Sequence, residues 1–329
     1  MAVRTTTLHR GPAIAERSQP SAPTVWESIR KHFWSYAFLA PAILLIALFV
    51  VYPLVASIQV TLYDWNGIGN PTRYVGMQHF YSVAADPLFW NAFAHTFTYM
   101  AVLVPVQLLL ALVLALVLNN PRLRGSTIYR AIYFSPVVTS AALIGIVMSM
   151  LLSSVGTRVS DALLEAGLIA QPLDLLGDPR FALAAVIFVG IWHTLGYNLV
   201  YFLAGLQSIP RDVYEAADVD GAGAFVKFFK VTVPMLRGVG AIILFLAILG
   251  SLQVFDLVLV MTGGGPYFSS EVVSTYIYHY AFTPASVAAE SNVGYASAAA
   301  LFMGVIVMGF TLIQLVVARY IRQQGTSKA

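Results

Sequence analysis

The chain has 329 residues, of which 59% are hydrophobic and only 10% are charged. Soluble domains carry about 25% charged residues, so this composition argues against a soluble enzyme and favours a membrane protein. There are 0 cysteines, which excludes disulfides, thiolate metal sites and a cysteine nucleophile.

Six apolar segments reach the length of about 20 residues that a helix needs to cross a bilayer. They are apolar on all sides, whereas the helices of a soluble bundle carry a polar stripe. Only the fifth contains a charged residue, Asp256. The segments are 37–59, 97–118, 131–152, 181–206, 239–262 and 293–318. We therefore expect an all-α integral membrane protein with six transmembrane helices.

Lysine and arginine residues are unevenly distributed between the two sides of these segments. Fifteen lie in the N-terminal tail, before the third and fifth segments and at the C-terminus. Only three lie on the other side, namely Arg73, Arg158 and Arg180. Cytoplasmic segments of membrane proteins carry an excess of basic residues. The asymmetry predicts a multi-pass protein of the cell (inner) membrane with both termini in the cytoplasm.

The segments also define the domain organisation. Residues 1–36 lack helical periodicity and predict a disordered cytoplasmic tail. Residues 37–322 are expected to form the six-helix transmembrane domain, which includes a cytoplasmic loop over 207–237. Residues 323–329 form a short C-terminal tail. The first apolar segment is too long for the core of a signal peptide, so we expect it to remain as an anchor.

The longest charged connection is SIPRDVYEAADVDGAGAFVKFFKVTVPMLRG, which runs over 208–238. About 2–8 residues would suffice to join neighbouring helices, so this connection is more than a link. RDVYEAADV predicts a short helix that Gly221 ends, because glycine tolerates the left-handed conformation. AFVKFFKVTV predicts a second, amphipathic segment. The residues alone leave open whether this pair docks a partner or lies on the bilayer surface.

The chain lacks the common patterns of catalytic and cofactor sites. No GxxxxGK[ST] phosphate loop occurs, and DGAGAF lacks the third glycine of a dinucleotide site. The six histidines show no HExxH spacing, and no GxSxG elbow is present. Basic residues are spread among the segments that flank the membrane, which gives no support for nucleic-acid binding. We expect no catalytic site, no metal site and no cofactor in this chain.

The loop resembles the EAA motif of membrane subunits of ABC importers that depend on a binding protein. The resemblance rests on LQSIPRDVYEAADVDGAGAFVKFFKVTVPML, with Gly238 where many relatives have a second proline. It extends to LQVFDLVLVMTGGGP, YIYHYAF, APAILLIALFVVYPL, YDWNG and YVGMQHF, and so covers most of the chain. The sequence is most similar to the maltose/glycerol-3-phosphate type of permease subunit, the first of two non-identical subunits.

The resemblance implies that the chain translocates a sugar, in particular an oligosaccharide, into the cytoplasm. The expected partners are a second homologous permease subunit, two ATPase subunits that bind ATP and Mg²⁺, and an extracytoplasmic solute-binding protein. The resemblance also implies that the loop couples this chain to the ATPase. The coupling residues would be Glu215, Ala216, Ala217, Asp220 and Gly221.

Polar and aromatic residues at membrane depth predict the substrate path, because such groups are costly in lipid unless they serve a function. IWHTLGYN in the fourth segment offers aromatic faces and polar groups that suit a sugar. The resemblance implies that Tyr197 and, less directly, Gly250 and Ser251 contribute to sugar binding. The predicted path consists of Trp192, His193, Tyr197, Asn198, Gly250, Ser251, Gln253 and Asp256.

Several alternatives remain open at this point. His193 could form a hydrogen bond between helices, and Asp256 could have a structural partner. An importer of the same type could carry glycerol 3-phosphate or a polyol, although no cluster of basic residues at membrane depth favours a phosphorylated cargo. An enzyme acting on lipid-linked sugars would need a second carboxylate or a metal site, and Asp256 stands alone. A proton-coupled carrier has only His193 and Asp256 in its favour.

Overall fold

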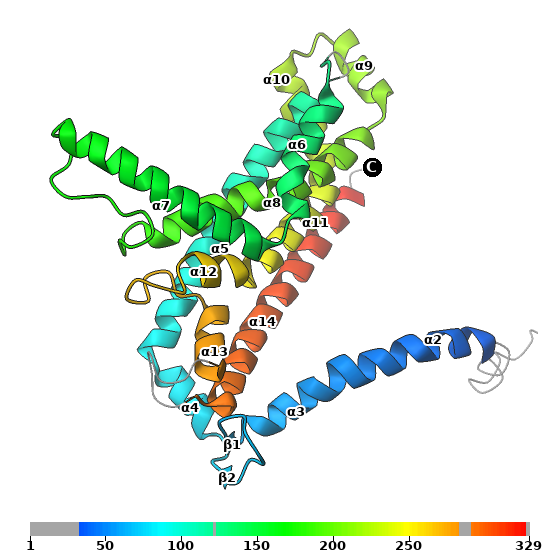
Figure 1. The fold of residues 1–329 in the computed structure, drawn as a ribbon. Helices are drawn as coiled ribbons and strands as arrows, with labels where there is room; N and C mark the ends of the chain where they lie inside the picture. The colour runs from blue at the N-terminus through cyan, green and yellow to red at the C-terminus, as the bar shows by residue number, and fades with distance from the viewer. Residues whose placement is uncertain (1–32, 121–122, 283–290, 327–329) are drawn as a thin grey trace, which may run out of the picture. The chain divides into compact units, whose positions relative to one another are not determined.

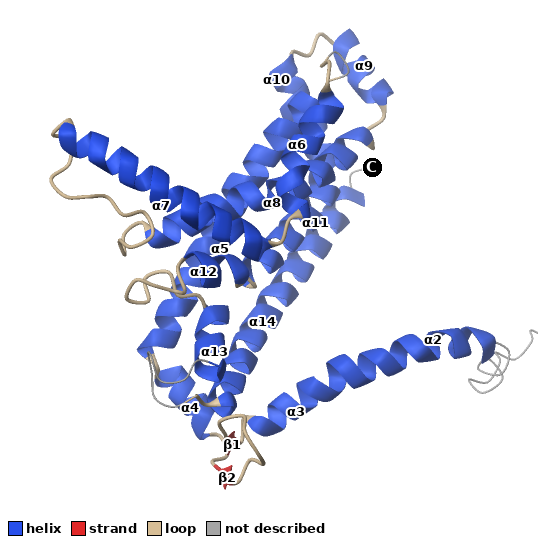
Figure 2. Ribbon diagram, viewed as in Figure 1, coloured by secondary structure: helices blue, strands red, loops and turns tan. Residues whose placement is uncertain are grey.

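The computed structural model describes residues 33–120, 123–282 and 291–326, which are helical along most of their length (Figure 2). It divides into two units, Met1–Ala56 and Ser57–Ala329. Six helices among the described residues are long and apolar enough to cross a membrane. The prediction of an all-α membrane protein with six transmembrane helices is confirmed.

A single apolar helix accounts for the described part of the first unit and ends at Val60. α2 (Phe33–Ile46), the π-turn η1 (Ala47–Val51) and α3 (Tyr52–Val60) follow one another without interruption. The π-turn ends two residues before Pro53. A proline ring clashes with the carbonyl group four residues earlier, and a wider turn at that point relieves the clash.

The second unit begins with a short antiparallel hairpin. The hairpin pairs Tyr63 with Tyr74 and Asp64 with Arg73. Arg73 Nη1 donates a hydrogen bond to Asp64 Oδ2 at 2.9 Å, which supports the same pairing. The first elements of this unit are β1 (Tyr63–Asp64), β2 (Arg73–Tyr74), α4 (Gln78–Ala85) and α5 (Pro87–Leu118).

The third predicted segment forms two helices instead of one. α6 (Ser126–Val138) ends before Thr139, whose backbone is extended, and α7 (Ala141–Glu165) starts two residues later in a different direction (Figure 1). Pro136 lies in the last turn of α6, where it removes a backbone donor and favours a break. The prediction of one helix over 131–152 is therefore wrong, and α7 is the helix of membrane-spanning length.

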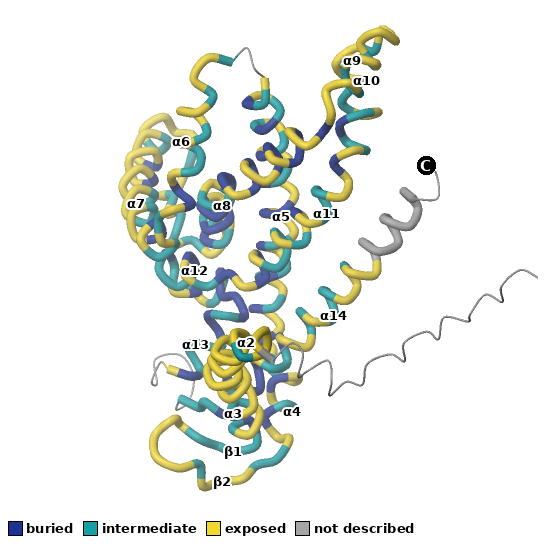
Figure 3. The backbone as a smooth tube through the Cα atoms, turned by 90° about the vertical axis from the view of Figure 1, so that its right-hand side faces the viewer, coloured by how far each residue is buried: buried dark blue, intermediate teal, exposed yellow. Residues whose placement is uncertain are grey.

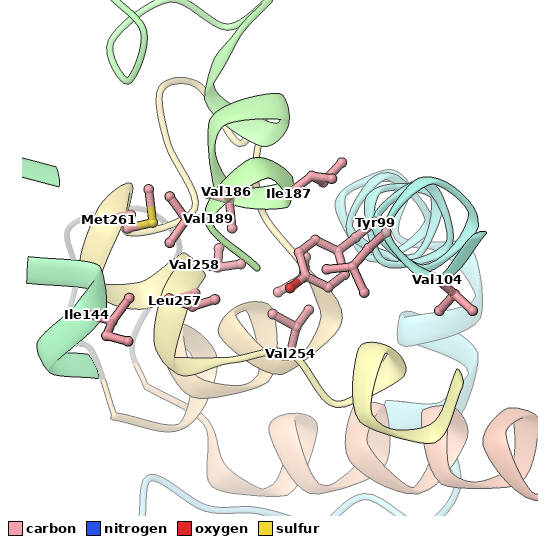
Figure 4. Packing of buried hydrophobic residues seen from close by; sticks show 12 residues of the cluster. Tyr99, Val104, Ile144, Val186, Ile187, Val189, Val254, Leu257, Val258 and Met261 are labelled. Carbon is pink, nitrogen blue, oxygen red and sulfur yellow. The ribbon is translucent and has the colours of Figure 1, made fainter. Parts of the chain in front are cut away.

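α8 (Ala182–Gln207) packs against both α5 and α6. Figure 3 shows buried residues along much of α8 and α5. Gly196 allows the close approach of α6, because a Cβ atom at this position would lie 2.5 Å from the carbonyl oxygen of Tyr133. Apolar side chains from α5, α7 and α8 meet those of a later short helix in one core cluster, part of which Figure 4 shows.

The connection after α8 contains the two short helices that the sequence predicts. They are followed by a second π-turn, which ends two residues before Pro234 just as η1 ends two residues before Pro53. The chain is helical without interruption from Ala224 to Leu252, so the second short helix runs directly into the fifth membrane helix. The elements are α9 (Arg211–Val219), α10 (Ala224–Lys227), η2 (Phe228–Thr232) and α11 (Val233–Leu252).

The fifth predicted segment, 239–262, is also divided. α11 ends at Leu252, and the short helix α12 (Asp256–Met261) begins after a three-residue break. The break places Val254 in the core, where it is 9% exposed, while Gln253 and Asp256 stay outside it. A continuous helix over this segment is therefore a wrong prediction.

The last two helices are α13 (Val273–Phe282) and α14 (Val293–Thr326). Of the two predicted tails, residues 33–36 belong to α2 and residues 323–326 belong to α14. The remaining positions of these tails lie outside the described residues.

Asp86 connects the start of α5 to α13 and α14. One carboxylate oxygen accepts a hydrogen bond from the backbone N–H of Leu88 at 2.8 Å, which caps α5. The other accepts hydrogen bonds from the hydroxyl groups of Tyr276 and Tyr295 at 2.5 and 2.9 Å. Since Tyr276 lies in α13 and Tyr295 in α14, a single carboxylate joins three helices.

Glu271 is a buried carboxylate in the connection between α12 and α13. It is 2% exposed, and burial raises its pKa to about 7, although a hydrogen bond from Thr275 opposes the shift. His279 Nδ1 lies 3.2 Å from Glu271 Oε1, and burial lowers the pKa of this histidine. His95 of α5 faces the same residue, with Nδ1 3.1 Å from the Glu271 carbonyl oxygen. The fold therefore favours the neutral form of the Glu271 side chain.

The Glu271→Gln variant is expected to be more stable than the wild type at pH 8.5 and to lose this advantage at pH 5. Because the pKa of Glu271 is higher in the folded state, its stabilising effect is complete below its ordinary pKa and is lost as the pH rises through about 7. The difference at high pH corresponds to about 3 kcal/mol. Thermal unfolding in detergent at the two pH values measures this difference. Glu165→Gln, at the exposed end of α7, is the control. Equal pH profiles for all three proteins would contradict the assignment.

Candidate functional site

A cavity of about 380 Å³ lies among α5, α8, α11 and α12. Seven of the eight residues predicted for the substrate path line this cavity. They come from α8, from the end of α11 and from the start of α12, so two stretches far apart in the sequence meet there. The seven are His193, Tyr197, Asn198, Gly250, Ser251, Gln253 and Asp256.

The α8 wall of the cavity presents one face of that helix. His193, Tyr197 and Tyr201 all line the cavity and follow at intervals of four residues, which places them on the same side of α8. Tyr197 is 46% exposed, and its ring lies edge-on to Phe134 at a centroid distance of 6.2 Å. This wall therefore offers aromatic surface to a bound molecule.

His193 is connected to the break between α6 and α7. Its Nε2 lies 3.3 Å from the carbonyl oxygen of Thr139, the residue that follows α6. Carbonyl groups at a helix end lack an intrahelical donor, and the imidazole supplies one. The hydrogen bond between helices that the sequence leaves open for His193 is present, and the residue lines the cavity as well.

Gln107 of α5 is a cavity residue that the sequence analysis does not select. It is 2% exposed, and the Thr194 hydroxyl contacts its side-chain oxygen at 2.5 Å and the Gly190 carbonyl oxygen at 2.8 Å. Asn198 Nδ2 donates to the Thr194 carbonyl oxygen at 3.3 Å. The signal for Gln107 is an amide inside an apolar segment. The other aromatic lining residues that were not selected are Tyr99, Tyr201 and Phe255.

The opposite wall of the cavity is formed by the end of α11 and the start of α12. A Cβ atom at Gly250 would meet no heavy atom within 4 Å, so this glycine leaves open space. Ser251 is 4% exposed and donates to the Ile248 carbonyl oxygen at 2.8 Å. Asp256 is exposed and has no hydrogen bond or ion pair with any residue that the structure describes. The structural partner considered for Asp256 is thus not found among the described residues.

Trp192 does not join the other predicted substrate-path residues. It lines a separate cavity of about 480 Å³, together with Tyr133, Pro136, Leu143 and other residues of α6 and α7. One step along a helix turns a side chain by about 100°, so Trp192 and His193 point to different sides of α8.

Of the five predicted coupling residues, three lie in α9 and two, Asp220 and Gly221, lie in the turn that follows it. The Gly221 N–H donates to the Asp218 carbonyl oxygen at 3.1 Å, and the Ala222 N–H donates to the Ala217 carbonyl oxygen at 2.9 Å. Gly221 has a left-handed backbone with φ +73°. This pair of hydrogen bonds around a left-handed glycine is the Schellman motif, which ends the helix and redirects the chain.

Two side-chain contacts hold the α9–α10 hairpin. The Tyr214 hydroxyl of α9 lies 2.9 Å from Thr232 Oγ1 of η2, and Lys227 Nζ of α10 lies 2.5 Å from Asp218 Oδ1 of α9. Figure 1 shows α9 and α10 at the opposite end of the second unit from α4 and the β-hairpin. Of the predicted coupling residues, Glu215, Ala216, Asp220 and Gly221 are exposed, whereas Ala217 is half-buried.

No group of three or more histidine, aspartate or glutamate residues in the described part of the chain could hold a metal ion.

The chain resembles a known protein family and several curated proteins. Residues 89–323 match the family model described as "Binding-protein-dependent transport system inner membrane component". The sequence is 36% identical to the lactose transport system permease protein LacF of Rhizobium radiobacter, over 79% of this chain and 88% of that protein. It is 29% identical to the trehalose/maltose transport system permease protein MalF of Thermococcus litoralis, over 87% of this chain and 94% of that one.

The fold also matches a solved structure. A chain of a bacterial ABC transporter involved in the import of the acidic polysaccharide alginate superposes with a TM-score of 0.75. The match covers 91% of this chain and 99% of that chain, at 23% sequence identity. At this identity the likeness establishes the shared fold.

Proposed function

The chain belongs to the family of binding-protein-dependent transport system inner membrane components, and from this premise we propose that it moves a neutral sugar into the cytoplasm. It is a multi-pass permease of the inner membrane. The observation that carries the proposal is the main cavity, whose lining combines tyrosine rings, amides and hydroxyl groups. Aromatic faces pack against the C–H faces of sugar rings, and the polar groups pair with sugar hydroxyls.

The charge of the cavity favours an uncharged cargo. Its lining contains one carboxylate, Asp256, and no lysine or arginine. Phosphate and carboxylate groups are bound in proteins mainly by arginine and lysine side chains. Glycerol 3-phosphate and acidic sugars therefore fit this cavity less well than neutral oligosaccharides. The names of LacF and of the arabinooligosaccharide permease AraP of Bacillus subtilis refer to neutral sugars.

The α9–α10 turn is the proposed coupling element for an ATPase. The distribution of basic residues supports a cytoplasmic position for this turn. The chain shows no phosphate-binding loop, so energy has to come from a partner. Glu215, Ala216, Asp220 and Gly221 are exposed on a hairpin whose base is fixed by Tyr214, so motion of a docked subunit would be passed on to α11.

The proposed assembly contains a second permease subunit, two ATPase subunits that hold ATP and Mg²⁺, and an extracytoplasmic solute-binding protein. In this assembly the present chain binds cargo and transmits motion, and hydrolysis takes place on the ATPase. A lipid-linked-sugar enzyme is less well supported, because Asp256 is the only carboxylate in the cavity lining. A proton-coupled carrier is also less well supported, because the His193 ring forms a hydrogen bond with the carbonyl oxygen of Thr139.

The proposal is tested by sugar uptake into cells that express the chain with its partner subunits. A panel of labelled lactose, maltose, trehalose and arabinobiose is compared with glycerol 3-phosphate and an alginate oligosaccharide. We expect saturable uptake of at least one neutral sugar, which disappears when either the ATPase or the binding protein is omitted. Uptake that continues without the ATPase, or uptake of the acidic compounds only, would contradict the proposal.

A further inference from the structure

Tyr99 is a buried side chain of the main cavity whose hydroxyl group has no hydrogen-bond partner in the described part of the protein. Tyr99 lies in α5, is 3% exposed and lines the cavity together with Leu103, Val254 and Leu257. Its hydroxyl forms no hydrogen bond with any residue that the structure describes. The oxygen atom itself is not fully enclosed, so it meets the space of the cavity and can pair with a bound molecule.

The other polar side chains deep in this cavity find partners within the protein. Gln107 is in contact with Thr194, and Ser251 donates to the backbone of its own helix. His193 reaches the Thr139 carbonyl oxygen. The hydroxyl groups of Tyr197 and Tyr201 belong to side chains that are 46% and 41% exposed, so they remain accessible from the open side. Tyr99 combines deep burial with a free hydroxyl.

The surroundings of the Tyr99 ring hold the hydroxyl in place without pairing it. A Cβ atom at Gly190 would lie 2.3 Å from the Tyr99 oxygen, so α8 approaches the hydroxyl closely only because a glycine is present. Figure 4 shows the ring among the side chains of Val186, Val254 and Leu257. Phenylalanine would fill the same space, so packing alone does not account for the oxygen atom.

We infer that the Tyr99 hydroxyl recognises one hydroxyl group of the transported sugar and thereby contributes to cargo specificity. A phenol both donates and accepts a hydrogen bond, as a sugar hydroxyl does. Because the ring is fixed by packing, the bond selects one position on the sugar. The inference rests on the proposed function, and it assigns a recognition role on α5, the helix that the sequence-based substrate path does not include.

The test compares Tyr99→Phe with the wild type in the complete importer. Uptake is measured for the neutral sugar that the wild type transports fastest in the panel above, and for each of its monodeoxy derivatives. The same binding protein serves both importers, so a change in the preference among these sugars reports on the membrane subunit. Tyr133→Phe is the matched control, because Tyr133 lines the separate cavity with Trp192.

We expect the wild type to transport one monodeoxy derivative about tenfold less efficiently than the parent sugar, and Tyr99→Phe to transport these two equally. The parent sugar should require a higher concentration for half-maximal uptake in Tyr99→Phe, at a similar maximal rate. The control should keep the wild-type preference.

Unchanged preferences in Tyr99→Phe would overturn the inference, and so would an equal loss for every sugar accompanied by a lower unfolding temperature, which indicates packing. A wild type that takes up none of the neutral sugars would instead refute the proposed function itself.

Discussion

Exchange of Gly221 for valine is expected to reduce sugar uptake by roughly tenfold or more, while the chain still inserts into the membrane. Gly221 has φ +73° at the end of α9, a conformation that L-residues adopt at a cost and that β-branched residues disfavour most. A Cβ atom here would meet nothing within 4 Å, so the effect comes from the backbone conformation. Valine would disturb the Schellman turn and displace the exposed residues that we propose for coupling.

Gly221→Asn is the matched variant for this prediction. Asparagine also adds a side chain, but it tolerates the left-handed conformation better than other residues with a Cβ atom. We expect it to retain most of the uptake and normal assembly with the ATPase. Uptake is measured together with the amount of inserted protein. Equal defects in the two variants would show that the conformation of Gly221 is not what matters.

Exchange of Gly250 for phenylalanine is expected to abolish sugar uptake without preventing folding. The position opens into the main cavity, and a Cβ atom would meet no heavy atom within 4 Å. A benzyl group would therefore occupy the space proposed for the sugar instead of clashing with the core. ATP hydrolysis that is stimulated by the binding protein should continue, because the α9–α10 hairpin is unchanged.

Gly240→Phe is the control for the blocked cavity. Gly240 lies on the same helix, is equally free of neighbours within 4 Å and does not line the cavity. Its uptake should remain within about twofold of the wild type, because a side chain added at this position meets open space and leaves the cavity free. If both variants lose uptake to the same extent, bulk on α11 rather than obstruction of the cavity is responsible.

Hydropathy predicts much of the fold, and the two helix breaks that it does not predict have a common cause. Six apolar segments predict six membrane helices because length and apolar character are what a bilayer requires. The same criterion cannot detect a break inside an apolar stretch. Pro136 predicts only a kink, yet the helix ends at Val138 and the backbone of Thr139 is extended. Gly250 precedes the break at Gln253 by three residues, but a single glycine inside an apolar helix does not predict a break; here the polar side chains stay out of the core while Val254 enters it.

The candidate site also contains residues that the sequence predicts and residues that it does not. Polar residues of IWHTLGYN and the sequence around Asp256 stand out against apolar neighbours, and the structure places seven of the eight predicted residues at one cavity. Trp192 was grouped with them from its chemistry, but its position on α8 turns it to another cavity. Tyr99 gave no signal, because an aromatic residue in an apolar helix is usual and only the packing reveals its free hydroxyl.

We propose that energy enters this chain through the α9–α10 turn, on the cytoplasmic side of the membrane. Since the chain has 0 cysteines, Asp220→Cys provides a single thiol at the exposed turn. A maleimide that carries a photo-crosslinker is attached to this thiol in the complete importer. We predict that a membrane-impermeant maleimide labels the thiol only in inside-out vesicles, and that illumination joins the chain to the ATPase subunit. Labelling from the outside of intact cells, with no adduct to the ATPase, would contradict the account.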